Sequence, residues 1–299
     1  MSKSRNANGL AKKIVRQTSL KQSTASRLAK QAHVYLGSSV VDSSDPHQRR
    51  LEAYIAHVLA DGFKDRQLNG ALLGVRAAEP EGQSVKLTLE SDMADEVLRH
   101  LLPRFDHFYG GVRGVAGLRI RGSERELKLH DAASSAHVTV TRADGGHIHL
   151  PSARDGEVLL WKRVPGGLSH DERQEAEGWT DSRGIEDLRV RDLLLSRILR
   201  CPGLVNSTAE PHGFANCYTH HAGDLVIEWC CGDTVEALCA GLLAHGFADD
   251  VPRANAVELI SRRSAHLGDR TVILNRHESC LYGPNAEDVA ASIRMDYES

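Results

Sequence analysis

The cysteines of this 299-residue chain are confined to its last third and include one spacing typical of a zinc ligand pair. All six lie between Cys201 and Cys280, and Cys217 and His220 form a C-x2-H pair. A structural zinc ion needs four Cys or His ligands, usually in two such short spacings, and the sequence has no second one. Two alternatives stay open: a zinc site that includes Cys217 and His220, or buried free thiols that act as small hydrophobic side chains. We favour the free thiols and expect no cofactor.

A pair of histidines suggests a different metal chemistry. His147 and His149 flank Ile148 in a predicted strand, where residues two apart face the same side. The segment resembles the His-hydrophobic-His motif of rolling-circle replication initiators, relaxases and related transposases. In those enzymes the two imidazoles bind a divalent metal and a helix tyrosine attacks the phosphodiester, so the resemblance implies a metal-dependent single-strand nuclease. The pattern shows no tyrosine on a downstream helix, and we expect an exposed hairpin instead.

Other enzyme signatures are absent from the sequence. It contains no G-x4-G-K-[ST] phosphate loop, no H-E-x-x-H zinc motif and no G-x-S-x-G nucleophile elbow. An ATPase, a zincin metalloprotease and an α/β-hydrolase therefore lose their main support. A non-enzymatic role is favoured.

The distribution of charge is the most informative feature of the sequence. Residues 1–40 carry eight basic side chains and no acidic one, whereas the remaining residues carry 29 basic and all 40 acidic side chains, a net charge of −11. A basic segment of this kind is typical of a nucleic-acid contact, whose affinity comes from neutralised phosphates. The acidic remainder disfavours wrapping of DNA over the whole surface.

Residues 11–30 have the pattern of two helices joined by a tight turn at Thr18-Ser19. Leu20, Ala25 and Leu28 are the predicted buried positions of the second half. The segment resembles the helix-turn-helix of bacterial, plasmid and phage DNA-binding proteins, whose second helix enters the major groove. The resemblance implies nucleic-acid contacts by Lys12, Lys13, Arg16, Lys21, Gln22, Ser23, Ser26, Arg27 and Lys30. Gln22 and Arg27 would contact base edges, and the lysines and serines would contact phosphates.

Two features depart from that motif. Ser19 occupies the turn position that usually holds glycine, although a left-handed conformation is costly for serine. No helix is predicted before Leu10, so the usual third helix would have to be supplied by residues 46–63.

The changing hydrophobic period predicts an α+β fold with antiparallel sheets behind a basic helical N-terminal segment. We expect a helix-turn-helix-like arm over residues 1–36, a polar linker over 37–45, an α+β domain over 46–164, and acidic linker helices with a second α+β domain over 165–299. Local patterns predict helices over 46–63 and 93–108, strands over 71–76, 114–121 and 147–150, and a turn at 79–82.

Together these features predict a cytoplasmic DNA-binding protein, either a transcription regulator or a plasmid or phage maintenance factor. Its acidic body would form a homo-oligomer or bind a protein partner or ligand. No apolar run approaches 18 residues and none follows the basic N-terminus, so we expect neither a transmembrane helix nor a secretory leader. The alternatives are the nuclease that uses His147 and His149, and an adaptor or assembly subunit whose arm binds RNA or an acidic partner.

Overall fold

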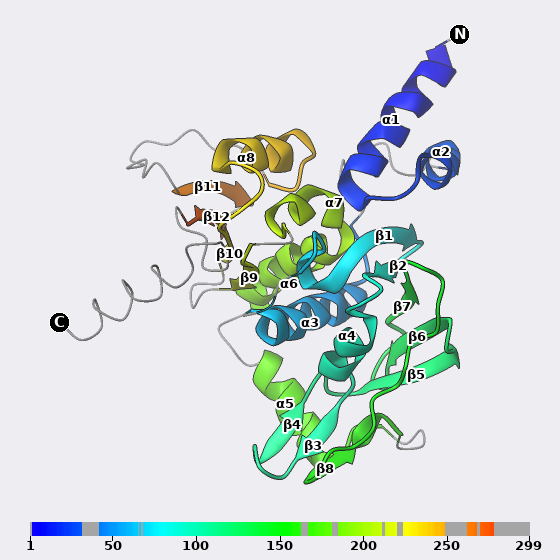
Figure 1. Cartoon of the computed structure of the whole chain (residues 1–299), viewed down its shortest axis with the longest axis vertical. Coiled ribbons are helices and arrows are strands. Elements are labelled where there is room, and N and C mark those ends of the chain that lie inside the picture. The colour runs from blue at the N-terminus through cyan, green and yellow to red at the C-terminus, as the bar shows by residue number, and fades with distance from the viewer. Residues whose placement is uncertain are drawn as a thin grey trace, which may run out of the picture.

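Helices and strands are mixed along the chain, and this confirms the predicted α+β class (Figure 1). The computed structural model describes residues 2–31, 42–64, 66, 68–162, 167–180, 185–210, 213–219, 224–248, 262–267 and 270–277. The helices are α1 (Ser2–Thr18), α2 (Gln22–Gln31), α3 (Pro46–Phe63), α4 (Ala94–Leu101), α5 (His170–Thr180), α6 (Ile185–Arg200), α7 (Pro202–Val205) and α8 (Val235–Ala244), with short 3-10 helices η1 (Leu72–Gly74), η2 (Leu160–Lys162) and η3 (Asn206–Thr208).

The strands form three sheets. A five-stranded sheet has the order β1 (Val75–Glu81), β2 (Ser84–Leu89), β7 (His137–Arg142), β6 (Glu126–Asp131) and β5 (Leu118–Ser123), and of its pairs only β2–β7 is parallel. A four-stranded sheet has the order β11 (Arg262–Leu267), β12 (Arg270–Arg276), β10 (Leu225–Trp229) and β9 (Ala215–Thr219). A three-stranded sheet has the order β4 (Gly111–Arg113), β3 (Arg104–Asp106) and β8 (Glu157–Leu159).

The five-stranded sheet has one apolar and one polar face. Side chains alternate along each strand, so that Leu87 and Leu129 lie in the core while Lys86 and Lys128 lie on the opposite face. A largely antiparallel sheet can leave one face in water. The polar face is therefore open to contacts with a ligand or partner.

Helix α3 lies within the body and packs along α6. Asp45 caps its N-terminus by accepting a hydrogen bond from the His47 amide at 2.9 Å, and proline begins the first turn as predicted. A fully buried ion pair joins the two helices: Arg200 donates from Nε to Glu52 Oε2 and from Nη2 to Oε1, both at 2.7 Å. Gln48 and Ser196 donate to the same carboxylate, which satisfies the buried charge.

One hydrophobic cluster extends through both segments that the sequence assigns to separate domains, from Leu51 to Leu274. The predicted linker is also tied to the body, because Asp42 pairs with Arg197 at 2.6 Å; residues 37–41 lie outside the described residues. The division near residue 164 stays a prediction, but the α3–α6 contact gives the two segments a common core.

Several predicted boundaries are wrong for local reasons. Residues 71–76 form η1 and only the start of β1, because the chain bends at Leu73, whose φ is 59°. β1 then runs through most of the predicted turn at 79–82, since proline is tolerated in an edge strand. The predicted helix 93–108 ends at Leu101, because Pro103 favours an extended residue before it. The predicted strand 114–121 begins only at Leu118.

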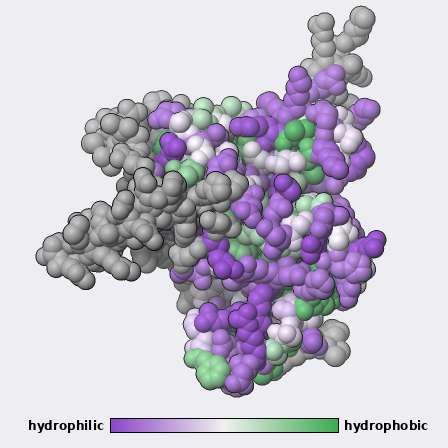
Figure 2. Space-filling model, viewed as in Figure 1, coloured by the Kyte–Doolittle hydropathy of each residue, from purple (hydrophilic) through white to green (hydrophobic). Residues whose placement is uncertain are grey.

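Figure 2 shows hydrophilic residues over much of the visible face, including the region of α1 and α2. Among the described helices, none has the length and apolar character needed to span a bilayer.

Candidate functional site

Helices α1 and α2 form the helix pair that the sequence predicts, with α1 ending at Thr18 and α2 beginning at Gln22. The pair has its own small core of Ala11, Ile14, Ala25 and Ala29, against which Leu20 and Leu28 pack. Ser19 has a φ of 56°, the left-handed conformation for which glycine is usual at this position. The Thr18 hydroxyl holds the turn by donating to the Ile14 carbonyl at 2.6 Å.

All nine side chains predicted to contact nucleic acid lie at the surface of this helix pair. Ser26 is half-buried, and the others are exposed: Lys12, Lys13, Arg16, Lys21, Gln22, Ser23, Arg27 and Lys30. Neither helix has an acidic residue in its first turn, so the positive end of each helix dipole is uncompensated. The arrangement therefore attracts anions over the described part of both helices.

The body holds the helix pair at the end of α1, while the other end of α1 points away from it (Figure 1). A Cβ on Gly203 of α7 would lie 2.3 Å from the Arg16 carbonyl oxygen, so the two backbones touch. Gln17 donates to the His245 carbonyl at 3.1 Å. The expectation that residues 46–63 supply a third helix is wrong: α3 is covered by the body core, and α7 packs beside α1 instead.

Two of the predicted base-contacting residues differ in position. Gln22 lies exposed in the first turn of α2 and donates to Ser26 Oγ at 3.3 Å. Arg27 lies on the side of α2 that faces β1, where its guanidinium pairs with Glu79. Gln22 is therefore open to a ligand, whereas Arg27 contacts the body in this structure.

His147 and His149 are exposed and pair with different carboxylates. His147 Nδ1 lies 3.0 Å from Glu124 Oε2, and His149 Nδ1 lies 2.8 Å from Asp95 Oδ2. Arg125 Nε donates to His147 Nε2 at 3.2 Å, which occupies the lone pair that a metal would need. Among the described residues, no group of three or more His, Cys, Asp or Glu side chains could hold a metal ion.

The predicted strand over residues 147–150 is wrong. The strand β7 ends at Arg142, whose guanidinium pairs with Asp144 at 2.9 Å and closes a turn. The chain then leaves the sheet, and the buried side chain of Ile148 anchors the segment. The alternation of polar and apolar residues reflects this single anchor rather than a strand ladder.

The cysteines of the described segments lie mostly in the core. Cys217 faces Ile227 across β9 and β10, and burial raises the pKa of its thiol to about 12. Cys201, Cys230 and Cys239 are also buried, which is the position predicted for hydrophobic thiols. His220 lies outside the described residues, so the zinc pair stays an alternative.

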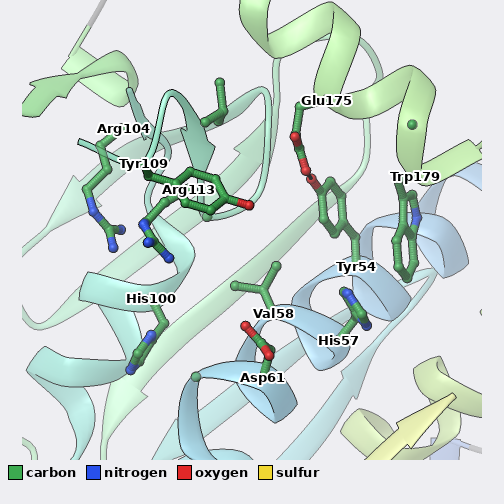
Figure 3. Close-up of a pocket in the computed structure, with 14 residues that line it drawn as sticks. Tyr54, His57, Val58, Asp61, His100, Arg104, Tyr109, Arg113, Glu175 and Trp179 are labelled. Carbon is green, nitrogen blue, oxygen red and sulfur yellow. Dashed lines mark hydrogen bonds between the residues drawn. The ribbon is translucent and has the colours of Figure 1, made fainter. Parts of the chain in front are cut away.

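A cavity of about 350 Å³ opens between α3, α4, α5 and the β3–β4 hairpin. Figure 3 shows Tyr54, His57 and Trp179 on one side and Arg113 on the other. Tyr54 stacks on Trp179 with ring centroids 4.8 Å apart. Burial lowers the pKa of His57 and of His100, so both imidazoles are neutral near pH 7 and can donate or accept a hydrogen bond.

Sequence reasoning missed this cavity because its lining has no local signature. Tyr54 and Glu175, whose side chains meet at 3.5 Å, are 121 residues apart. On α3, His57 and Asp61 are four residues apart and therefore lie on the same side of the helix. This spacing could have indicated a shared site, but pairs of this kind are common on helices and do not by themselves predict a cavity. The cavity can hold a polar ligand, because it offers carboxylates, imidazoles and two guanidinium groups.

Comparison with protein-family models, with curated proteins and with solved structures finds no match to this chain. Its function is therefore argued from the geometry of its own residues.

Proposed function

We propose that this protein binds duplex DNA through α1 and α2, with α2 in the major groove. The observation that carries the proposal is the exposed basic surface of a helix pair whose turn has the left-handed residue at Ser19. A helix pair of this form presents the first turn of its second helix to base edges. The first turn of α2 contains Gln22 and Ser23, and Lys21 directly precedes it.

The charge of the rest of the chain favours contact of duplex DNA with this helix pair. Lys12, Lys13, Arg16, Lys21 and Lys30 are exposed there, and the chain beyond residue 40 has a net charge of −11. The acidic body repels a polyanion, so DNA approaches from the side of α1 and α2. The contact of α7 with the end of α1 fixes the orientation of the helix pair.

A DNA-binding titration of the full chain tests the proposal. The variant Lys12→Gln/Lys13→Gln/Lys21→Gln removes three exposed charges, and Lys64→Gln/Arg125→Gln/Arg154→Gln removes three from exposed positions of the body. If the three lysines contact phosphates, their loss weakens binding by roughly 500-fold at 0.1 M salt, from a factor of about 8 for each contact. The body variant should change affinity by a few-fold only.

Equal effects of the two triple variants would overturn the proposal, because binding would then follow net charge and not the helix pair. Tighter binding of RNA than of duplex DNA would favour the adaptor alternative. Sequence preference is tested on a site selected from random duplexes: Gln22→Ala should reduce discrimination by about 1–3 kcal/mol, whereas Lys12→Gln should weaken all sequences alike.

A further inference from the structure

A second cavity, whose lining is mainly basic, lies on the five-stranded sheet, at the edge opposite to β1. It has a volume of about 440 Å³, which is enough for a nucleotide-sized ligand. Its lining comes from β5, β6 and the turn that follows β6: Arg119, Arg121, Lys128, His130, Asp131, Ala132, Ser134 and Ser135, with Gly167. This β5–β6 cavity shares no residue with α1 and α2.

The strand register places its basic side chains directly opposite each other. Arg119 faces His130, and Arg121 faces Lys128. Like charges at facing positions destabilise a sheet, so the Arg121–Lys128 pair is unfavourable unless an anion lies between the two groups. Local arrangements that reduce stability are expected at binding sites.

Carboxylates neutralise only part of this charge. Glu172 binds Arg119 in a bidentate ion pair, with distances of 2.8 and 3.0 Å. The Asp131 carboxylate accepts from the Ala133 amide at 3.0 Å and from the Ser134 hydroxyl at 2.6 Å. Within the described part of the chain, Arg121 and Lys128 have no ion-pair partner.

The histidine between these cations shows that the cavity is electropositive. Burial lowers the pKa of His130, the positive charges of Arg121, Arg119 and Lys128 lower it further, and Asp131 opposes them. Its Nδ1 atom is buried and has no hydrogen-bond partner among the described residues.

We propose that the β5–β6 cavity binds a phosphate group, carried either by a small phosphorylated molecule or by a nucleic-acid strand. Arg121 and Lys128 provide charge-assisted hydrogen bonds from two strands, and His130 lines the same cavity. A phosphate has enough oxygen atoms to accept from both groups at once. The site is independent of α1 and α2.

Calorimetric titration of the full chain with inorganic phosphate, with adenosine monophosphate and with a single-stranded oligonucleotide tests the proposal. Arg121→Gln and Lys128→Gln should each weaken phosphate binding about tenfold, or about 1.4 kcal/mol. Arg154→Gln removes the same charge from an exposed residue outside the cavity and should have no effect. Phosphate should also raise the pKa of His130, which is followed by its ring proton resonances. The unfolding temperatures of the variants confirm that they are folded.

The three ligands distinguish the two sources of the phosphate group. Binding of phosphate or the mononucleotide identifies a small phosphorylated ligand, whereas binding of the oligonucleotide alone identifies the nucleic-acid backbone. Both outcomes require that Arg121→Gln and Lys128→Gln weaken the interaction. The proposal is overturned if no ligand binds, or if the two cavity variants and Arg154→Gln bind equally well.

Discussion

Replacing Glu79 by glutamine should strengthen DNA binding, because the change releases Arg27 from β1. The side chains of the pair are 55% and 21% exposed, so the ion pair lies at the surface. Its loss should lower the free energy of unfolding by at most about 1 kcal/mol. A freed guanidinium can contact a phosphate as well as the base edge assigned to it above. One added phosphate contact raises affinity roughly eightfold at 0.1 M salt and steepens the slope of log K against log salt by about 0.9.

The assay is fluorescence anisotropy of a labelled duplex between about 50 and about 200 mM salt. Glu81→Gln is the matched control: it removes one negative charge two residues along the same strand, from an exposed side chain that leaves the Arg27 contact intact. The double variant Glu79→Gln/Arg27→Gln should lose the gain in affinity and in slope. If Glu79→Gln and Glu81→Gln behave alike, Arg27 does not reach DNA, and its place in the proposed interface is refuted.

Three further predictions concern positions that hold the structure together. Gly203→Val should detach the helix pair from α7, because the new side chain collides with the Arg16 carbonyl. We expect the free energy of unfolding to fall by about 1–3 kcal/mol and trypsin to cleave faster within α1 and α2. Arg200→Ala leaves the Glu52 carboxylate buried without its ion-pair partner, so the free energy of unfolding measured with urea should fall by about 3–5 kcal/mol. An unchanged free energy of unfolding would contradict this prediction. The pKa values of His57 and His100 are lowered from 6.5, so the unfolded chain binds protons that the folded chain does not. The contribution of the two neutral imidazoles to the free energy of unfolding is therefore fully present above pH 6.5 and is lost as the pH falls through their lower folded-state pKa values. His57→Gln/His100→Gln should flatten this pH dependence in acid titrations followed by circular dichroism.

The sequence predicts the helix pair well because its signals are local. The apolar spacing around Thr18-Ser19 lies within one short stretch, and it locates the turn between the helices and the end of α2 correctly. The start of α1 is not predicted, because α1 begins at Ser2, before the apolar spacing sets in. Proline and the Asp45 cap likewise define the start of α3. Each of these features depends on residues fewer than about five positions apart, as helix caps and turns do.

The sites in the body depend on contacts that no local pattern contains. Arg121 and Lys128 meet only because β5 and β6 pair in one register. Glu52 and Arg200 are 148 residues apart, so neither could be recognised as a partner of the other. The wrong strand over residues 147–150 has the same origin: Ile148 is buried by distant elements, and its alternation with histidine imitates a strand.

The Glu52–Arg200 contact also sets the order in which the chain can fold during synthesis. Since 148 residues separate the partners, α3 leaves the ribosome roughly 7 to 30 s before α6 does, at ordinary rates of translation. For that time the apolar residues of α3 lack the helix that covers them, and the nascent chain is open to chaperones and to aggregation. The helix pair has its own small core from residues 11–29, so the contacts between its two helices need no residue of the body. The surface that we propose to bind DNA is thus synthesised before the body that orients it.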